Sequence, residues 1–124
     1  MRLAFAIIAL PIAACVATPA GMPVGQARDL VGRAAGAAQR CVPIERSVAL
    51  TVADGNTHML LYGRGKTIWA NDLGANCGFA RGDTLVVQPI GANYCHGDLV
   101  RSVNPFSGIR GPSCFLGDFV PYTR

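Results

Sequence analysis

The sequence predicts a small all-β protein, and three observations support this fold class. Short stretches alternate apolar and polar residues with period two, which is typical of half-buried strands. Turn signals separate these stretches, and Asp54-Gly55 is the strongest of them. Cysteines recur at wide intervals through the same region. We therefore expect an antiparallel meander of about six strands. It would form a sandwich or open barrel stapled by disulfides, and a short N-terminal helix is the one optional addition.

Composition limits the chain to one domain with one core. Its 124 residues are 51% hydrophobic and 15% charged, which favours a packed globule over disorder. The net charge of +4 comes from eleven basic and seven acidic residues, and the basic residues form no run. Nucleic-acid binding needs clustered basic residues, so we expect no nucleic-acid partner.

The N-terminus has the pattern of an export signal. Arg2 precedes an apolar run over residues 3–14, which is too short for a permanent membrane span but fits a signal peptide. The run ends in Ile12-Ala13-Ala14-Cys15, which resembles the bacterial lipobox. We predict a lipoprotein signal peptide over 1–14 and lipidation at Cys15. The alternative is an ordinary secretory signal that is cleaved a few residues later, which would leave a soluble periplasmic or secreted protein.

A tether is expected between the lipid and the folded domain. Residues 15–40 are rich in Ala, Gly and Pro. Within them, the apolar residues of 27–39 recur with helical spacing, but Gly32 and Gly36 interrupt the pattern and lower its helix propensity. This stretch is either a short helix or a continuation of the tether. The β domain is expected to occupy residues 41–124.

Six strands are expected in the β domain, at 46–52, 57–62, 67–71, 83–89, 99–103 and 115–120. A two-residue loop at Asp54-Gly55 would place Ala53 opposite Asn56 and Val52 opposite Thr57. A four-residue loop at 63–66 would place Tyr62 opposite Thr67. Together the two hairpins define a core face, formed by Val48, Leu50, Val52, Met59, Leu61, Ile68 and Ala70. The opposite face carries Leu60, Tyr62 and Trp69, and we expect the cysteine loops or a partner to cover it.

Four cysteines remain after Cys15. In an oxidising compartment they favour two disulfides, for which three connectivities are possible. Structural zinc sites usually use closely paired cysteines, and no such pair is present, so we expect no metal site. We predict that Cys77 bonds with Cys95, and Cys41 with Cys114.

The order of these motifs is similar to that of a family of short exported bacterial proteins with a domain of unknown function. The resemblance covers residues 40–122 and uses three segments: Ile68-Trp69-Ala70-Asn71-Asp72-Leu73 before Cys77, Tyr94-Cys95-His96-Gly97-Asp98, and Cys114-Phe115-Leu116-Gly117-Asp118-Phe119. It implies that Asn71, Leu73 and Asp98 are recurring positions of the family. It implies no activity or substrate.

Two groups of residues are candidates for binding. His96, Asp98 and Asn71 could gather hydrogen-bonding groups, but Asp and Asn beside Gly more often hold their own turns, and we favour that structural role. Tyr62 and Trp69 could form an aromatic platform for a glycan or peptide. Equally, they could pack beneath the cysteine loops, and we favour this core role because a single sheet needs cover on both faces.

No catalytic motif of a hydrolase, metalloprotease or nucleotide-binding enzyme is present, so we assign no catalytic residue and no cofactor. The sequence therefore predicts a lipid-anchored, periplasm-facing protein of the bacterial cell envelope with a structural or binding role. Its expected partners are the membrane, through the lipid, and an envelope protein or glycan. The alternative is a small periplasmic hydrolase or metal-binding protein that uses His96, Asp98 and Asn71.

Overall fold

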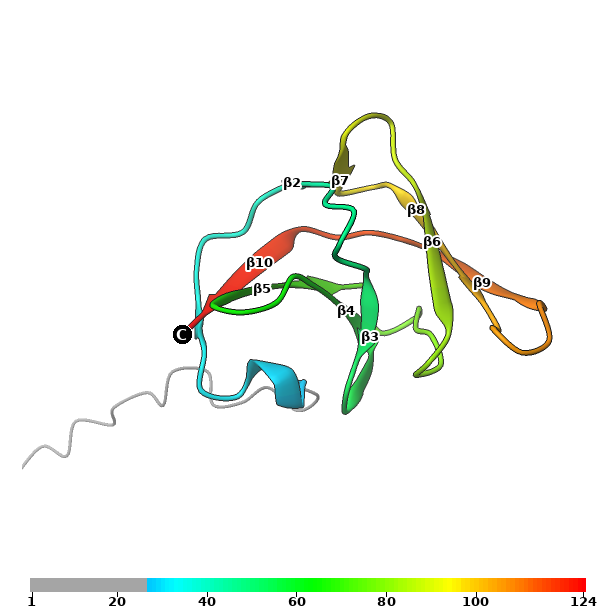
Figure 1. Ribbon diagram of the computed structural model, residues 1–124, viewed down its shortest axis with the longest axis horizontal. Helices are drawn as coiled ribbons and strands as arrows, with labels where there is room; N and C mark the ends of the chain where they lie inside the picture. Colours follow the sequence, from blue (N-terminus) through cyan, green and yellow to red (C-terminus); the bar gives the residue numbers. More distant parts are fainter. Residues whose placement is uncertain (1–26) are drawn as a thin grey trace, which may run out of the picture.

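The computed structural model describes residues 27–124, and nearly all regular structure in this part of the chain is β (Figure 1). Its strands are β1 (Ala34–Ala35), β2 (Cys41–Pro43), β3 (Thr51–Ala53), β4 (Asn56–Tyr62), β5 (Thr67–Asp72), β6 (Thr84–Gln88), β7 (Asn93–Cys95), β8 (Leu99–Val103), β9 (Arg110–Phe115) and β10 (Phe119–Thr123). The expected all-β class is confirmed. The predicted signal peptide, Cys15 and the first part of the tether lie outside the described residues.

Three antiparallel sheets make up the domain. The largest has the strand order β1-β10-β5-β4-β3, the second has the order β6-β8-β9, and β2 and β7 form a two-stranded ribbon. In Figure 1 the β8 and β9 hairpin extends away from the five-stranded sheet. The arrangement is an open sandwich, which is one of the two architectures that the strand pattern predicts.

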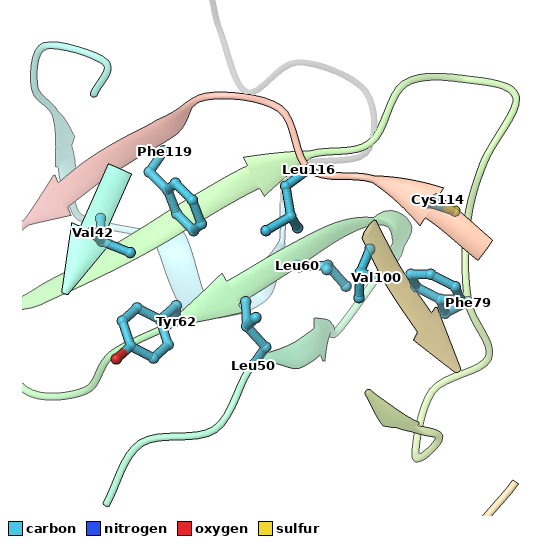
Figure 2. Close-up of a cluster of buried hydrophobic side chains, with 9 residues drawn as sticks. All are labelled: Val42, Leu50, Leu60, Tyr62, Phe79, Val100, Cys114, Leu116 and Phe119. Carbon is cyan, nitrogen blue, oxygen red and sulfur yellow. The ribbon is translucent and has the colours of Figure 1, made fainter. Parts of the chain in front are cut away.

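The main core lies between the sheets. It is formed by Val42, Leu50, Leu60, Tyr62, Phe79, Val100, Cys114, Leu116 and Phe119. In Figure 2 the side chains of Phe119 and Leu116 point toward Leu60 and Val100, so the five-stranded and three-stranded sheets share this core. A second, smaller cluster on the opposite face of the five-stranded sheet joins Ala27 and Leu30 to Ala53, Leu61 and Ala70.

The predicted core face is divided between the two clusters. Leu61 and Ala70 do share a face, but that face carries the smaller cluster. The face predicted to be outer, with Leu60 and Tyr62, is part of the main core. Val48, Leu50 and Val52 lie with this main core, so they are core residues as predicted but do not share a face with Leu61.

The first hairpin explains the error in register. Ala53 does lie opposite Asn56, as expected, but the register shifts at the next residue, so that Val52 lies opposite Leu60 and not Thr57. The backbone of Thr57 and His58 bonds elsewhere: the Phe79 N–H donates to the Thr57 carbonyl at 3.0 Å, and the Leu73 N–H donates to the His58 carbonyl at 2.8 Å. A three-residue shift reverses which face each side chain occupies.

The second hairpin is shifted by two residues, with Tyr62 opposite Trp69 and Leu61 opposite Ala70. An even shift leaves the faces unchanged, so the predicted pairing partners are wrong but the division between faces within β4 and β5 is right. Thr67, which was expected opposite Tyr62, instead lies opposite Thr123 of β10.

The C-terminal region holds two strands where one was expected. The predicted strand at 115–120 is divided between β9 and β10, and β10 continues through Pro121. The Pro121 carbonyl accepts the Gly36 N–H at 2.7 Å, so this residue directs its backbone polar groups away from β5. In an antiparallel strand the N–H and C=O of a residue lie on the same side. The missing N–H therefore removes no bond to β5, and the strand tolerates the proline.

The N-terminal segment is ordered against the sheet, but it is not a helix. The expected helix over 27–39 is reduced to one 3-10 turn, Arg28–Leu30, which Gly32 follows with a φ of +77°. Leu30 is fully buried, and the Gln39 N–H donates to the Phe119 carbonyl at 2.7 Å. This stretch, which the sequence assigned to a helix or a tether, is thus attached to the sheet through Ala27, Leu30 and backbone bonds to β10, although most of residues 31–40 are exposed.

Two disulfides are present, but both predicted pairings are wrong. Cys41 bonds with Cys95, and Cys77 bonds with Cys114. The reason is the β2 and β7 ribbon, which no sequence signal predicted and which places Cys41 directly opposite Cys95. The second bridge joins the loop after β5 to β9 and so ties the two larger sheets together.

Candidate binding site

Asp98 belongs to a tight turn that begins at Cys95. Its Oδ2 accepts the Cys95 N–H at 2.8 Å, and its own N–H donates to the Cys95 carbonyl at 3.0 Å. Gly97 adopts a φ of +89°, which favours glycine in this turn. Asp98 is buried, and its carboxylate stabilises its own turn, which is the structural role that the sequence favoured.

Asn71 has the same kind of role from inside the five-stranded sheet. It is fully buried, its Nδ2 donates to the Gly117 carbonyl at 2.7 Å, and its Oδ1 accepts the Gly117 N–H at 2.8 Å. A Cβ on Gly117 would lie 2.7 Å from the Asp72 carbonyl oxygen, so only glycine fits this close approach. Asn71 therefore holds the crossover between β9 and β10, and no polar atom of its side chain is left for a ligand.

His96 is the one member of the predicted trio whose side chain is open to solvent. Its Nδ1 lies 2.8 Å from Asp118 Oδ1, and the side chains are 45% and 47% exposed. An ionised carboxylate can only accept, so Nδ1 is the donor in this contact, and Nε2 accepts only when the imidazole is neutral. Sequence reasoning placed Asp118 beside the cysteine loops but did not pair it with His96. The pairing depends on β10 passing close to the turn after Cys95, which the sequence does not show.

A small cavity of about 230 Å³ lies beside this pair. Its lining residues are Ile90, Gly91, Asn93, Cys95, His96 and Asp98. Of the polar side chains that line this cavity, Asp98 already accepts the Cys95 N–H, which leaves those of Asn93 and His96. Among the described residues, no group of three or more His, Cys, Asp or Glu side chains is placed to hold a metal ion.

Tyr62 is a core residue. It is buried, its hydroxyl donates to the Pro43 carbonyl at 2.8 Å and accepts the Glu45 N–H at 2.7 Å, and its ring meets Tyr94 edge to face at 5.4 Å. Burial raises the pKa of the Tyr94 phenol above its ordinary value, and the charge of the neighbouring Tyr62 phenol raises it further. The segment after β2 covers Tyr62, so the predicted core role is confirmed for Tyr62, although the covering segment differs from the one expected.

Trp69 is half-buried: it packs against the main core, as predicted, and also forms one wall of an open groove of about 320 Å³. The groove is lined by Glu45, Ser47, Val48, Tyr62, Gly63, Arg64, Thr67 and Trp69. Arg64 Nη2 donates to the Ser47 carbonyl across it. This groove, called the Trp69 groove below, combines an aromatic side chain with one carboxylate and one guanidinium. The sequence pointed to Trp69 but not to Glu45 or Arg64, because the loops that carry them meet only in the fold.

His58 is exposed. Its Nδ1 lies 2.7 Å from the Cys77 carbonyl oxygen, which can only accept, so Nδ1 donates. The ring borders an open cavity of about 380 Å³ whose other lining residues are Gly55, Asn56, Thr57, Asp72, Gly74 and Ala75. Asp72 Oδ1 already accepts the Gly74 N–H at 2.8 Å, and Asn56 Oδ1 accepts the His58 N–H at 3.0 Å.

Comparison of the chain with protein-family models, with curated proteins and with solved structures gave no match. The two disulfides are typical of proteins that fold in an oxidising compartment outside the cytoplasm. Within residues 27–124, no helix is long and apolar enough to cross a membrane.

Proposed function

We propose that this protein is exported to the bacterial cell envelope, is anchored there by lipid at Cys15, and acts as a non-catalytic binding domain. The engagement of Asn71 and Asp98 with the backbone is the observation that carries the proposal. Both side chains are buried and both bond with the turns beside them. A hydrolase would need such groups free to meet a substrate. Side chains that bond only with the backbone of the fold are consistent with a rigid scaffold.

The Trp69 groove is the surface that best fits a ligand. A half-exposed indole offers an apolar face on which a sugar ring can stack, and Glu45 and Arg64 offer one acceptor and several donors at its border. Binding sites commonly combine an aromatic wall with a few polar groups in this way. We therefore propose an envelope glycan as the ligand, and an envelope protein as the other outcome of the test below.

Lipidation is tested by mass spectrometry of the mature protein isolated from its native envelope. The expected N-terminus is Cys15 carrying acyl chains. A Cys15→Ser variant should lose this mass. An unmodified N-terminus beyond residue 15 would refute the lipid anchor.

Glycan binding is tested through the fluorescence of Trp69, the only tryptophan in the chain. Soluble peptidoglycan fragments should shift its emission in a saturable way. An Arg64→Ala variant should weaken the response about tenfold, because a charge-assisted contact typically contributes 1.5–3 kcal/mol. The matched control is Arg81→Ala, whose guanidinium lies 3.3 Å from Asp54 and outside the groove.

An unchanged emission at millimolar fragment would exclude the glycan. Cross-linking from Thr67 in intact cells would then test for an envelope protein in the groove. If neither a glycan nor a protein is captured, the groove is not the binding surface.

A further inference from the structure

Exposed apolar side chains concentrate on the three-stranded sheet. Among the described residues the large hydrophobic side chains left in solvent are Val31, Val86, Ile90, Phe106, Ile109 and Phe115. Four of these six belong to the β6-β8-β9 sheet or to its hairpin loop. The region of residues 99–115, called the β8–β9 arm below, carries three of them. Phe106 lies at its tip and is 98% exposed.

The tip of the arm is a turn that hydrogen bonds close. Asn104 Oδ1 accepts the N–H groups of Phe106 and Ser107 at 2.9 and 3.1 Å. The Asn104 N–H donates to the Ile109 carbonyl at 2.9 Å, which closes the loop, and Gly108 adopts a φ of +70°. These bonds fix the backbone of the loop that carries Phe106, so little backbone entropy would be lost when the loop meets a binding partner.

The charge of the arm has one sign. Arg101 and Arg110 are its only charged residues, and no Asp or Glu occurs from residue 99 to residue 117. Within the described part of the chain, neither arginine lies within 4.0 Å of a carboxylate, since the ion pairs there involve Arg28, Arg81 and His96. In Figure 1 the loop between β8 and β9 extends to the edge of the molecule, beyond the other strands.

We propose that the β8–β9 arm docks on the surface of an anionic lipid bilayer, with Phe106 and Ile109 entering the interface and Arg110 contacting lipid phosphates. A convex, ordered tip that joins aromatic and branched apolar side chains to cations fits this partner, because such side chains partition into the headgroup region while cations pair with anionic lipids. The surface is separate from the Trp69 groove, and the inference does not require a lipid on Cys15.

The test is vesicle flotation of the full chain carrying Cys15→Ser, so that no acyl chain contributes. Every variant shares residues 1–26, and any binding through them is therefore the same in each. Vesicles with a third of phosphatidylglycerol should retain the protein more strongly than vesicles of phosphatidylcholine alone, and salt should reduce the difference. Phe106→Ser should lower the partition coefficient roughly tenfold, since burial of an aromatic side chain contributes at least one factor of ten.

Matched control variants distinguish binding through the arm from nonspecific binding by any exposed apolar or basic side chain. Ile90→Ser removes an equally exposed apolar side chain, also 98% in solvent, from a loop without arginine, and it should leave binding unchanged. Arg110→Ser should weaken binding to anionic vesicles about fivefold, the effect expected of one arginine near a charged surface. Arg46→Ser, at an exposed position on a different loop, should leave this binding unchanged. All four positions are exposed, so melting temperatures should stay within about 2 °C.

A local reporter gives a second measurement. In a Trp69→Phe background, Phe106→Trp should be quenched strongly by brominated lipid, and Ile90→Trp only weakly. The proposal is overturned if the two indoles are quenched equally, if Phe106→Ser floats as well as the parent chain, or if the arm variants change only the oligomeric state in solution. None of these outcomes depends on the mass of the native N-terminus or on Trp69 binding a glycan, so failure here is distinct from failure of the proposed function.

Discussion

The five-stranded and three-stranded sheets differ in how many of their faces are covered. The five-stranded sheet is packed on both sides, with the main core against one face and Ala27 and Leu30 against the other. Among residues 27–124 the three-stranded sheet is packed on one side only. It contributes Val100 and Cys114 to the main core and leaves Val86 and Phe115 in solvent. The first sheet therefore stabilises the fold through both of its faces, and the second combines a core face with a surface available for contacts.

Two phenylalanines four residues apart give the sharpest test of this contrast. Phe119, on β10, is fully buried, whereas Phe115, on β9, is 67% exposed. Phe119→Ala should lower the free energy of unfolding by about 3–5 kcal/mol, because it leaves a large cavity in the core. Phe115→Ala should change it by less than about 0.5 kcal/mol. Urea denaturation of the oxidised protein measures both, and similar losses would show that the outer face of the three-stranded sheet is covered in solution.

The Cys77–Cys114 bridge is the disulfide that links the two sheets, and its removal should cause the next largest loss of stability. Replacing both cysteines by serine should cost about 2–4 kcal/mol, as is typical for a closed loop of this size. Hydrogen exchange should quicken first in β6, β8 and β9, because these strands depend on the bridge for their attachment. The control is the Cys41–Cys95 pair replaced in the same way, which should release β2 and β7 instead. Equal protection of β8 in the two variants would contradict this division.

Local patterns in the sequence were enough to predict the fold class and several strands. β8 runs from Leu99 to Val103 as expected, and the turn at Asp54-Gly55 forms as expected. Both signals are complete within a few residues. Pairing over longer distances was not predicted: Val52 meets Leu60 because the backbone of Thr57 bonds to the loop before β6, and nothing near Thr57 indicates this. One such shift was sufficient to exchange the main and minor faces of the sheet.

The candidate site shows the same limit. Asp98 acts within its own turn, and the Asp-Gly chemistry that predicts this role is local. His96 meets Asp118 only because β10 returns beside the turn, and Cys41 meets Cys95 only because β2 pairs with β7. With two cysteine pairs, spacing alone could not choose among three connectivities. The missing information in each case was the strand order.

Asn71 and Ser102 extend the comparison to polar side chains, since each is fully buried and each lies in a different sheet. Asn71→Ala should lower the free energy of unfolding by about 1–3 kcal/mol, because the partly buried N–H and C=O of Gly117 lose their side-chain partner. The neighbouring Asp72→Ala is the control. It removes one exposed bond to the Gly74 N–H and should cost less than about 1 kcal/mol.

Ser102 should respond in the opposite direction. Its Oγ has no hydrogen-bond partner among the described residues, and it packs so tightly on Gly111 that a Cβ there would meet the hydroxyl. Ser102→Ala removes a buried, unpaired hydroxyl and should raise the free energy of unfolding by up to about 1 kcal/mol. Ser113→Ala is the control, since its exposed Oγ accepts the Arg101 Nε–H and its loss should change stability by less than about 0.5 kcal/mol. A loss above 1 kcal/mol for Ser102→Ala would mean that the hydroxyl is paired in solution. The three-stranded sheet would then be as fully satisfied on its inner face as the five-stranded sheet is at Asn71.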